Sequence, residues 1–141
     1  MILYVESSAI LAWLLGEPTA TVAMHELGAA ASIVTSSLTS VECARGLARA
    51  RALGRITAGD ELAALRMFDE AEASWDVYDL SERVVTRARA SFPAEPIRTL
   101  DALHLATAQV FHQELGDVSV LSFDQRIRDN SIAMGMTVRP V

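Results

Sequence analysis

The stretch Met1-Ile2-Leu3-Tyr4-Val5-Glu6-Ser7-Ser8-Ala9-Ile10 opens the chain and decides its fold class. Residues 2–5 are apolar without alternation, which is typical of a strand buried on both faces of a parallel sheet. The run ends at a carboxylate followed by two hydroxyl residues, either of which can cap a following helix. Because ligands of open α/β sheets bind beyond the carboxyl ends of the strands, Glu6 is predicted to lie at the mouth of a site. The alternative interpretation is a solvated acid in the first turn of a helix.

Strand and helix patterns alternate along the rest of the chain. Further strands are expected at residues 32–36, 75–80, 118–123 and 137–139. Helices are expected from Ile10, from Thr19 to about Leu27, and from Thr39 or Ser40 to about Leu53. Three more helices are expected to begin after the capping residues Thr57, Ser81 and Thr99. Alternating polar residues place the strand at 75–80 near a sheet edge. This order predicts an α/β fold with a central parallel sheet of about five strands and helices on both faces, a three-layer α/β/α arrangement.

The length of the chain bounds its organisation. With 141 residues, 51% of them hydrophobic, we expect a single domain over residues 1–141. No apolar run approaches the ~20 residues of a membrane helix, and the N-terminus does not resemble a signal peptide. We therefore expect a cytoplasmic protein with no membrane partner. The one cysteine, Cys43, is predicted to be a small buried hydrophobic residue.

The charge balance narrows the function classes. The 18 acidic and 12 basic residues give a net charge of −6, which argues against nucleic-acid binding through a broad positive surface. All the basic residues are arginine, which excludes a Walker-type phosphate loop and argues against a phosphoacceptor receiver domain, since both use a lysine. Four arginines crowd one predicted helix and form either a solvated face or RNA phosphate contacts: Arg45, Arg49, Arg51 and Arg55.

Four acids carry the predicted chemistry. Glu6, Glu42, Asp101 and Asp124 each fall just past a predicted strand or in the first turn of a helix beside it. Carboxylates gathered at one end of a sheet repel one another unless cations lie among them. Oxygen ligands without clustered Cys or His select a hard divalent ion, Mg²⁺ or Mn²⁺. Such ions support phosphoryl-transfer chemistry.

At this point the sequence resembles the PIN-domain ribonucleases, and among them the VapC-type toxins of type II toxin–antitoxin systems. The resemblance covers nearly the whole chain and rests on the segments Leu3-Tyr4-Val5-Glu6-Ser7-Ser8-Ala9, Ser40-Val41-Glu42, Thr99-Leu100-Asp101-Ala102-Leu103-His104-Leu105-Ala106 and Leu121-Ser122-Phe123-Asp124-Gln125-Arg126. It implies a PIN-like domain in which the four acids bind Mg²⁺ or Mn²⁺, and it implies that the enzyme hydrolyses RNA phosphodiester bonds at this metal site. The family's first acid is usually aspartate, so Glu6 is a departure that places the carboxylate one methylene farther out.

The departure at position 6 leaves two functions open. The first is a metal-dependent endoribonuclease that acts as the toxin of a toxin–antitoxin pair. The second is a catalytically weak PIN-like module that binds RNA or protein. Ser8 and Ser122 are candidates for orienting metal ligands or water, with capping as the alternative. His104 is either a packed histidine or a group on the substrate side.

The resemblance also implies partners. We expect a small antitoxin that lays an apolar segment over the early helices and places an arginine among the four acids, because a guanidinium binds carboxylates bidentately. We also expect a homodimer. Apolar residues of the first and third helices that one core does not all need leave surface for both contacts: Leu11, Trp13, Leu14, Leu47 and Leu53.

Overall fold

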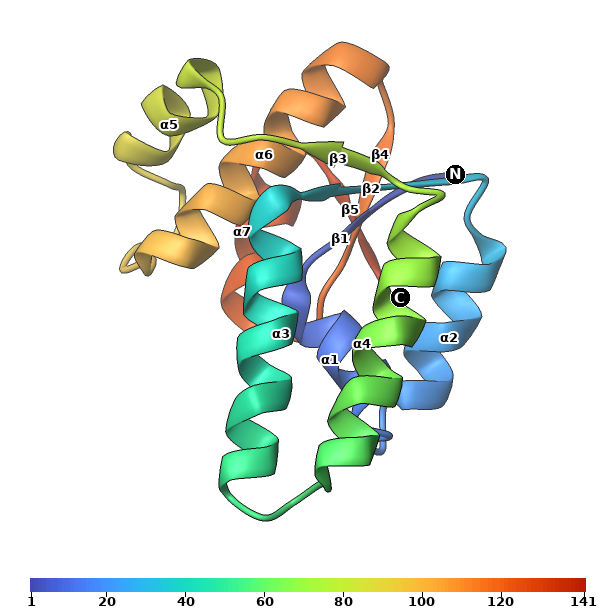
Figure 1. The fold of residues 1–141 in the computed structure, drawn as a ribbon. Helices are drawn as coiled ribbons and strands as arrows, with labels where there is room; N and C mark the ends of the chain where they lie inside the picture. The colour runs from blue at the N-terminus through green and yellow to red at the C-terminus, as the bar shows by residue number, and fades with distance from the viewer.

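A five-stranded parallel sheet forms the centre of the molecule in the computed structural model, which describes residues 1–141 (Figure 1). Its strands are β1 (Ile2–Val5), β2 (Ser32–Ser36), β3 (Asp76–Tyr78), β4 (Val118–Leu121) and β5 (Thr137–Arg139). They lie in the order β3-β2-β1-β4-β5, and all four pairings are parallel. The predicted α/β fold is confirmed, and β3 lies at a sheet edge as its alternating sequence predicts.

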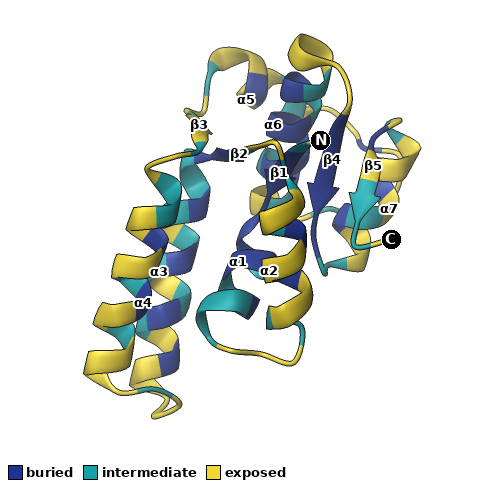
Figure 2. Ribbon diagram, turned by 90° about the vertical axis from the view of Figure 1, so that its right-hand side faces the viewer, coloured by how far each residue is buried: buried dark blue, intermediate teal, exposed yellow.

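Seven helices connect and cover the strands. They are α1 (Ser7–Leu14), α2 (Ala20–Ala29), α3 (Ser37–Ala52), α4 (Ala58–Glu72), α5 (Glu82–Arg89), α6 (Thr99–Leu115) and α7 (Gln125–Ala133). Helices α3 and α4 form a long hairpin with Gly54 in its turn, where a backbone φ of +72° favours glycine (Figure 1). Their outer faces are exposed, whereas β1 and β4 are buried in the middle of the molecule (Figure 2).

The side chains of β1 alternate between two cores. Leu3 and Val5 pack with buried residues of α1, α3 and α4. Tyr4 points to the opposite face and packs with buried residues of α6 and α7, including Phe111. Each face of the strand therefore has an apolar layer, which explains why β1 is apolar without alternation. The three-layer arrangement follows from this, and β1 is its central strand.

Side-chain caps set several of the helix starts. The hydroxyl of Thr57 accepts from the Asp60 amide (3.0 Å) while the Asp60 carboxylate accepts from the Thr57 amide (2.9 Å), so the predicted capping box at α4 is present. The prediction for α6 is wrong: Thr99 is its first residue, and Arg98 occupies the cap position without a side-chain bond. Helix α3 also begins earlier than predicted, because Ser36 caps it.

The predicted burial of Cys43 is confirmed, whereas the apolar residues expected to leave free surface divide into buried and exposed ones. Cys43 is fully buried, and burial raises the pKa of its thiol to about 12. Among the apolar residues expected to leave free surface, Leu47 belongs to the core, whereas Leu53 is exposed. None of the helices has the length and apolar character that a membrane crossing requires.

Candidate active site

The carboxyl ends of the three central strands meet at one edge of the sheet. Val5 pairs with Leu121 at the last register position shared by β1 and β4, so Glu6 and Ser122 are the next residues on neighbouring strands. Ser36 ends β2 on the other side of β1. Helices α1, α3 and α7 all begin from this edge, and the topology therefore gathers their first residues there (Figure 1).

Glu6 caps the first helix from a buried position. Its side chain is 3% exposed; its Oε2 accepts from the Ser8 amide (3.0 Å), and the Ser8 hydroxyl donates to its Oε1. Burial raises the pKa of Glu6, and hydrogen bonds from Ser8 and Ser122 together with the nearby His104 oppose that rise. The prediction that Ser7 or Ser8 caps a helix starting near Ile10 is wrong, because Glu6 is the cap and both serines lie in the first turn of α1.

Glu42 is held by a chain of buried side chains. His104, only 1% exposed, contacts Glu42 Oε1 through Nε2 and the Tyr4 hydroxyl through Nδ1 (2.7 Å). Because a carboxylate oxygen only accepts, Nε2 carries a proton; in the neutral ring Nδ1 then accepts from Tyr4. Of the two alternatives for His104, a packed side chain or a group on the substrate side, the structure shows the packed side chain. Its contact also fixes one carboxylate oxygen of Glu42. Glu42 itself lies in the second turn of α3 and not the first, because that helix begins at Ser37.

Asp101 lies in the first turn of α6, as predicted. Of the four acids, it makes the fewest side-chain hydrogen bonds with the protein. Burial is the largest cause that raises the pKa of Asp101, and repulsion from Asp124 is the next. Glu42 adds to that rise, whereas His104 and Arg98 oppose it. The charges of Asp101, Asp124 and Glu42 thus act on one another within a single cluster.

Asp124 ends the segment after β4 and caps α7. Its Oδ1 accepts from the amides of Arg126 (2.9 Å) and Ile127 (3.2 Å), and the Ser122 hydroxyl accepts from the Asp124 amide (3.0 Å). This use of one oxygen leaves Oδ2 without a hydrogen bond from the protein. The fully buried Ser122 therefore interacts with Glu6, which follows β1, and with Asp124, which follows β4.

The donor set of this cluster matches a hard divalent cation in its chemistry. All four candidate ligands are carboxylates, and the one nearby nitrogen donor, His104, is committed to Tyr4 and Glu42. No three His, Cys, Asp or Glu side chains are arranged to hold an ion as they stand. A cation at the cluster would counter the repulsion that raises the pKa of Asp101.

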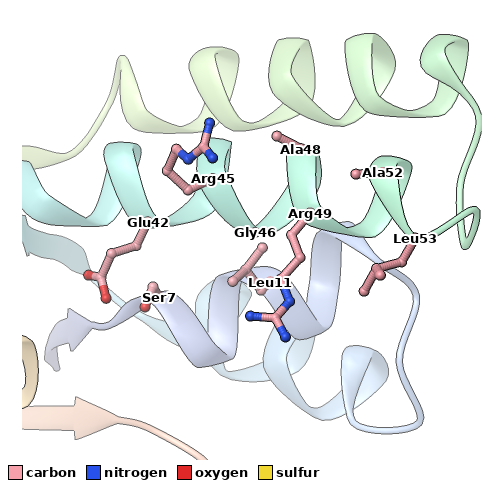
Figure 3. A pocket seen from close by; sticks show the side chains of 9 residues that line it. All are labelled: Ser7, Leu11, Glu42, Arg45, Gly46, Ala48, Arg49, Ala52 and Leu53. Carbon is pink, nitrogen blue, oxygen red and sulfur yellow. The ribbon is translucent and has the colours of Figure 1, made fainter.

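An open groove of about 740 Å³ lies between α1 and α3 and includes one acid of the cluster, Glu42, in its lining (Figure 3). Ser7 and Glu42 lie at one end of this groove, and Arg45 and Arg49 lie farther along α3 (Figure 3). The groove and the bond from Tyr4 to His104 are the features that the sequence did not reveal. The bond joins residues 100 positions apart, for which a single sequence carries no signal.

Fold and site together define a class: an α/β protein with an acidic cluster at the carboxyl edge of a parallel sheet. Residues 3–132 match the PIN domain family. The chain belongs to the PIN domain family, and its resemblance to VapC-type members is confirmed. It is 33% identical over 140 residues to Ribonuclease VapC46 of Mycobacterium tuberculosis, covering 96% of this chain and 95% of that protein. Ribonuclease VapC35 of the same species is 28% identical over 105 residues, 74% of this chain and 70% of that protein.

Solved structures show the same fold. The VapBC2 complex of Rickettsia felis, bound to a DNA fragment from its promoter, contains a chain that superposes with a TM-score of 0.67 at 10% identity, covering 99% of this chain and 98% of that one. FitAB bound to a DNA fragment gives a TM-score of 0.65 at 17% identity, with 98% and 93% covered. At these identities the likeness concerns the fold alone.

Proposed function

We propose that this protein is a metal-dependent endoribonuclease that hydrolyses RNA phosphodiester bonds and acts as the toxin of a toxin–antitoxin pair. The observation that carries the proposal is the state of Asp101, a half-buried acid whose pKa is raised by burial and by two neighbouring acids. Such repulsion is what a bound divalent cation would relieve. The names of the two relatives, both ribonucleases, support the choice of RNA as substrate.

Four residues would hold one or two Mg²⁺ or Mn²⁺ ions: Glu6, Glu42, Asp101 and Asp124. When bound, such ions activate water as a nucleophile and stabilise the leaving oxygen of a phosphodiester. The chain itself supplies orientation, since His104 holds one oxygen of Glu42 while Ser8 and Ser122 hold Glu6.

The test of the proposal is cleavage of single-stranded and structured RNA by the purified protein. We expect cleavage with Mg²⁺ or Mn²⁺ that stops when a chelator is added. Asp101→Asn should abolish cleavage and leave the melting temperature unchanged or raised, because it removes one of several mutually repelling acids. Cleavage that survives chelation, or an Asp101→Asn protein as active as the parent, would contradict the assignment.

The second candidate, a non-catalytic binding module, is favoured by one observation. Both oxygens of Glu6 already accept hydrogen bonds from Ser8, and the side chain is buried, so this acid is committed to capping α1. The module would bind RNA or a protein without cutting under any divalent ion. Metal-independent RNA binding in the absence of cleavage distinguishes it from the nuclease.

The partners we propose are an antitoxin and a second copy of the chain, both meeting in the cytoplasm. The antitoxin would place an arginine among the acids, where it competes with the ions for the same carboxylates. We expect the antitoxin to be encoded next to this protein, and co-expression of the two should yield a tight complex without nuclease activity. Size-exclusion chromatography of the protein alone should show a dimer. A neighbour that neither binds nor inhibits would remove the toxin assignment and leave the nuclease assignment standing.

A further inference from the structure

The groove between α1 and α3 presents two free cations beside an acidic cluster. Its lining residues are Ser7, Leu11, Glu42, Arg45, Gly46, Ala48, Arg49, Ala52 and Leu53. Arg45 and Arg49 are exposed, and neither guanidinium makes an ion pair or hydrogen bond with the protein. Arg51, on the same helix but outside the groove, is paired with Glu61 at 3.1 Å. The groove therefore holds unneutralised positive charge.

The spacing of these residues aligns them with the proposed reaction centre. Positions 42, 45 and 49 are separated by three and four residues, which places them on neighbouring positions of one side of α3. The side chains of Glu42 and Arg49 extend toward α1, and that of Arg45 extends toward α4 (Figure 3). With a rise of about 1.5 Å per residue, Arg49 lies roughly 10 Å along the helix axis from Glu42. Leu11 closes the groove floor at Gly46, where an added Cβ would meet its methyl carbons at 2.8 Å. A ligand lying along the groove would pass the positions of both arginines and end at Glu42.

We propose that this groove binds the sugar–phosphate backbone of the RNA strand on one side of the bond to be cut, with Arg45 and Arg49 each binding a phosphate. The inference rests on the proposed function and adds a route for the substrate. A protein of net charge −6 repels RNA overall, so affinity must come from local cations. Charge complementarity favours a polyanion at these arginines, and guanidinium groups bind phosphate bidentately.

The experiment measures RNA binding without cleavage, using the full-length protein in chelator and a fluorescein-labelled single-stranded oligonucleotide of mixed sequence. Fluorescence anisotropy across a salt series compares the parent with Arg45→Ala, Arg49→Ala and the double variant. The control is Arg66→Ala, which removes an equally exposed arginine from α4, outside the groove. Paired lysine substitutions at 45 and 49 keep the charge and serve as the rescue.

Counterion release sets the expected size of the effect. Each lost phosphate contact lowers the slope of log K against log salt by about 0.7 for a single strand, which is about fivefold in affinity at 0.1 M salt. The double variant should therefore lose about 25-fold, the lysine pair should recover most of that, and Arg66→Ala should match the parent. In cleavage assays with Mg²⁺, the double variant should raise KM with little change in kcat.

The outcomes separate this inference from the proposed function. If the parent cleaves RNA and the double variant has the KM and salt slope of Arg66→Ala, the groove proposal fails alone. If the parent neither binds nor cleaves RNA, both fail. If the double variant keeps its RNA affinity but loses affinity for the proposed antitoxin, the groove binds the antitoxin, and the proposal that it binds RNA is wrong.

Discussion

His104 shows how a single buried side chain can act on a site that it does not enter. One ring nitrogen contacts Glu42, the other contacts the Tyr4 hydroxyl, and the ring lies edge-on to the Tyr4 ring at 6.0 Å. These contacts leave the imidazole little freedom to rotate, so the orientation of one Glu42 oxygen is set by a residue on the central strand.

Replacing His104 tests this positioning role. His104→Gln should lower cleavage by about 10- to 100-fold and weaken Mn²⁺ binding, because the supporting hydrogen bond to Glu42 is lost or displaced. Mn²⁺ affinity measured by electron paramagnetic resonance gives a readout independent of turnover. Tyr4→Phe, which removes only the hydroxyl, should show a smaller loss of the same kind. Unchanged Mn²⁺ affinity in both variants would leave His104 with a purely structural role.

Glu6 is the second residue whose role a substitution can decide. If its extra methylene only displaces a bound ion, Glu6→Asp should preserve or improve cleavage, whereas Glu6→Ala should lose it through weaker ion binding. Glu6→Ala also removes the cap of α1, at a cost of about 1 kcal/mol. Melting temperatures of both variants therefore accompany the rates. Equal cleavage by all three proteins would mean that position 6 binds no catalytic ion.

At the scale of helices and strands, the acids are placed by turns and caps as much as by the sheet. The apolar run before Glu6 and the polar caps Thr57 and Ser81 were sufficient to predict β1, α4 and α5. The start of α6 was not, because Arg98 caps it without any side-chain bond. The loop before α6 is held instead by Asn130 of α7, a contact between residues 36 positions apart that local sequence does not encode.

Asn130 allows a direct test of that support. It is fully buried; its amide donates to the carbonyls of Ala94 (3.0 Å) and Arg126 (2.9 Å), and its carbonyl accepts from the Ala94 amide (2.9 Å). Asn130→Ala removes the partner of both the amide and the carbonyl of Ala94 and should cost about 2–3 kcal/mol in the free energy of unfolding. Urea denaturation measures the change, and Ser74→Ala at an exposed hydroxyl is the control. A loss no larger than that of Ser74→Ala would show that the loop is held by other contacts.

At the scale of the whole molecule, the acidic cluster makes stability depend on pH. Burial raises the pKa of both Glu6 and Asp101 above the values of unfolded carboxyls. Between the unfolded and the raised values the folded chain binds more protons, so the free energy of unfolding falls as the pH rises through that window. Without divalent ions, the parent should therefore gain stability relative to Asp101→Asn as the pH falls from 7 towards the ordinary pKa of aspartate, about 4. Thermal melts at both pH values measure this, and a parallel response of the two proteins would contradict it.

The order of the strands has a consequence for how the molecule is made. Strand β1 lies at the centre of the sheet and pairs on one side with β4, whose residues 118–121 are synthesised much later. Glu6 and Asp124 are therefore brought together only after the chain as far as Asp124 has left the ribosome. Pairing of strands so distant in sequence is also slow. A nuclease built in this way, under the function proposed above, stays inert until Asp124 has emerged, and so cannot cut the message that encodes it while the preceding residues are being translated.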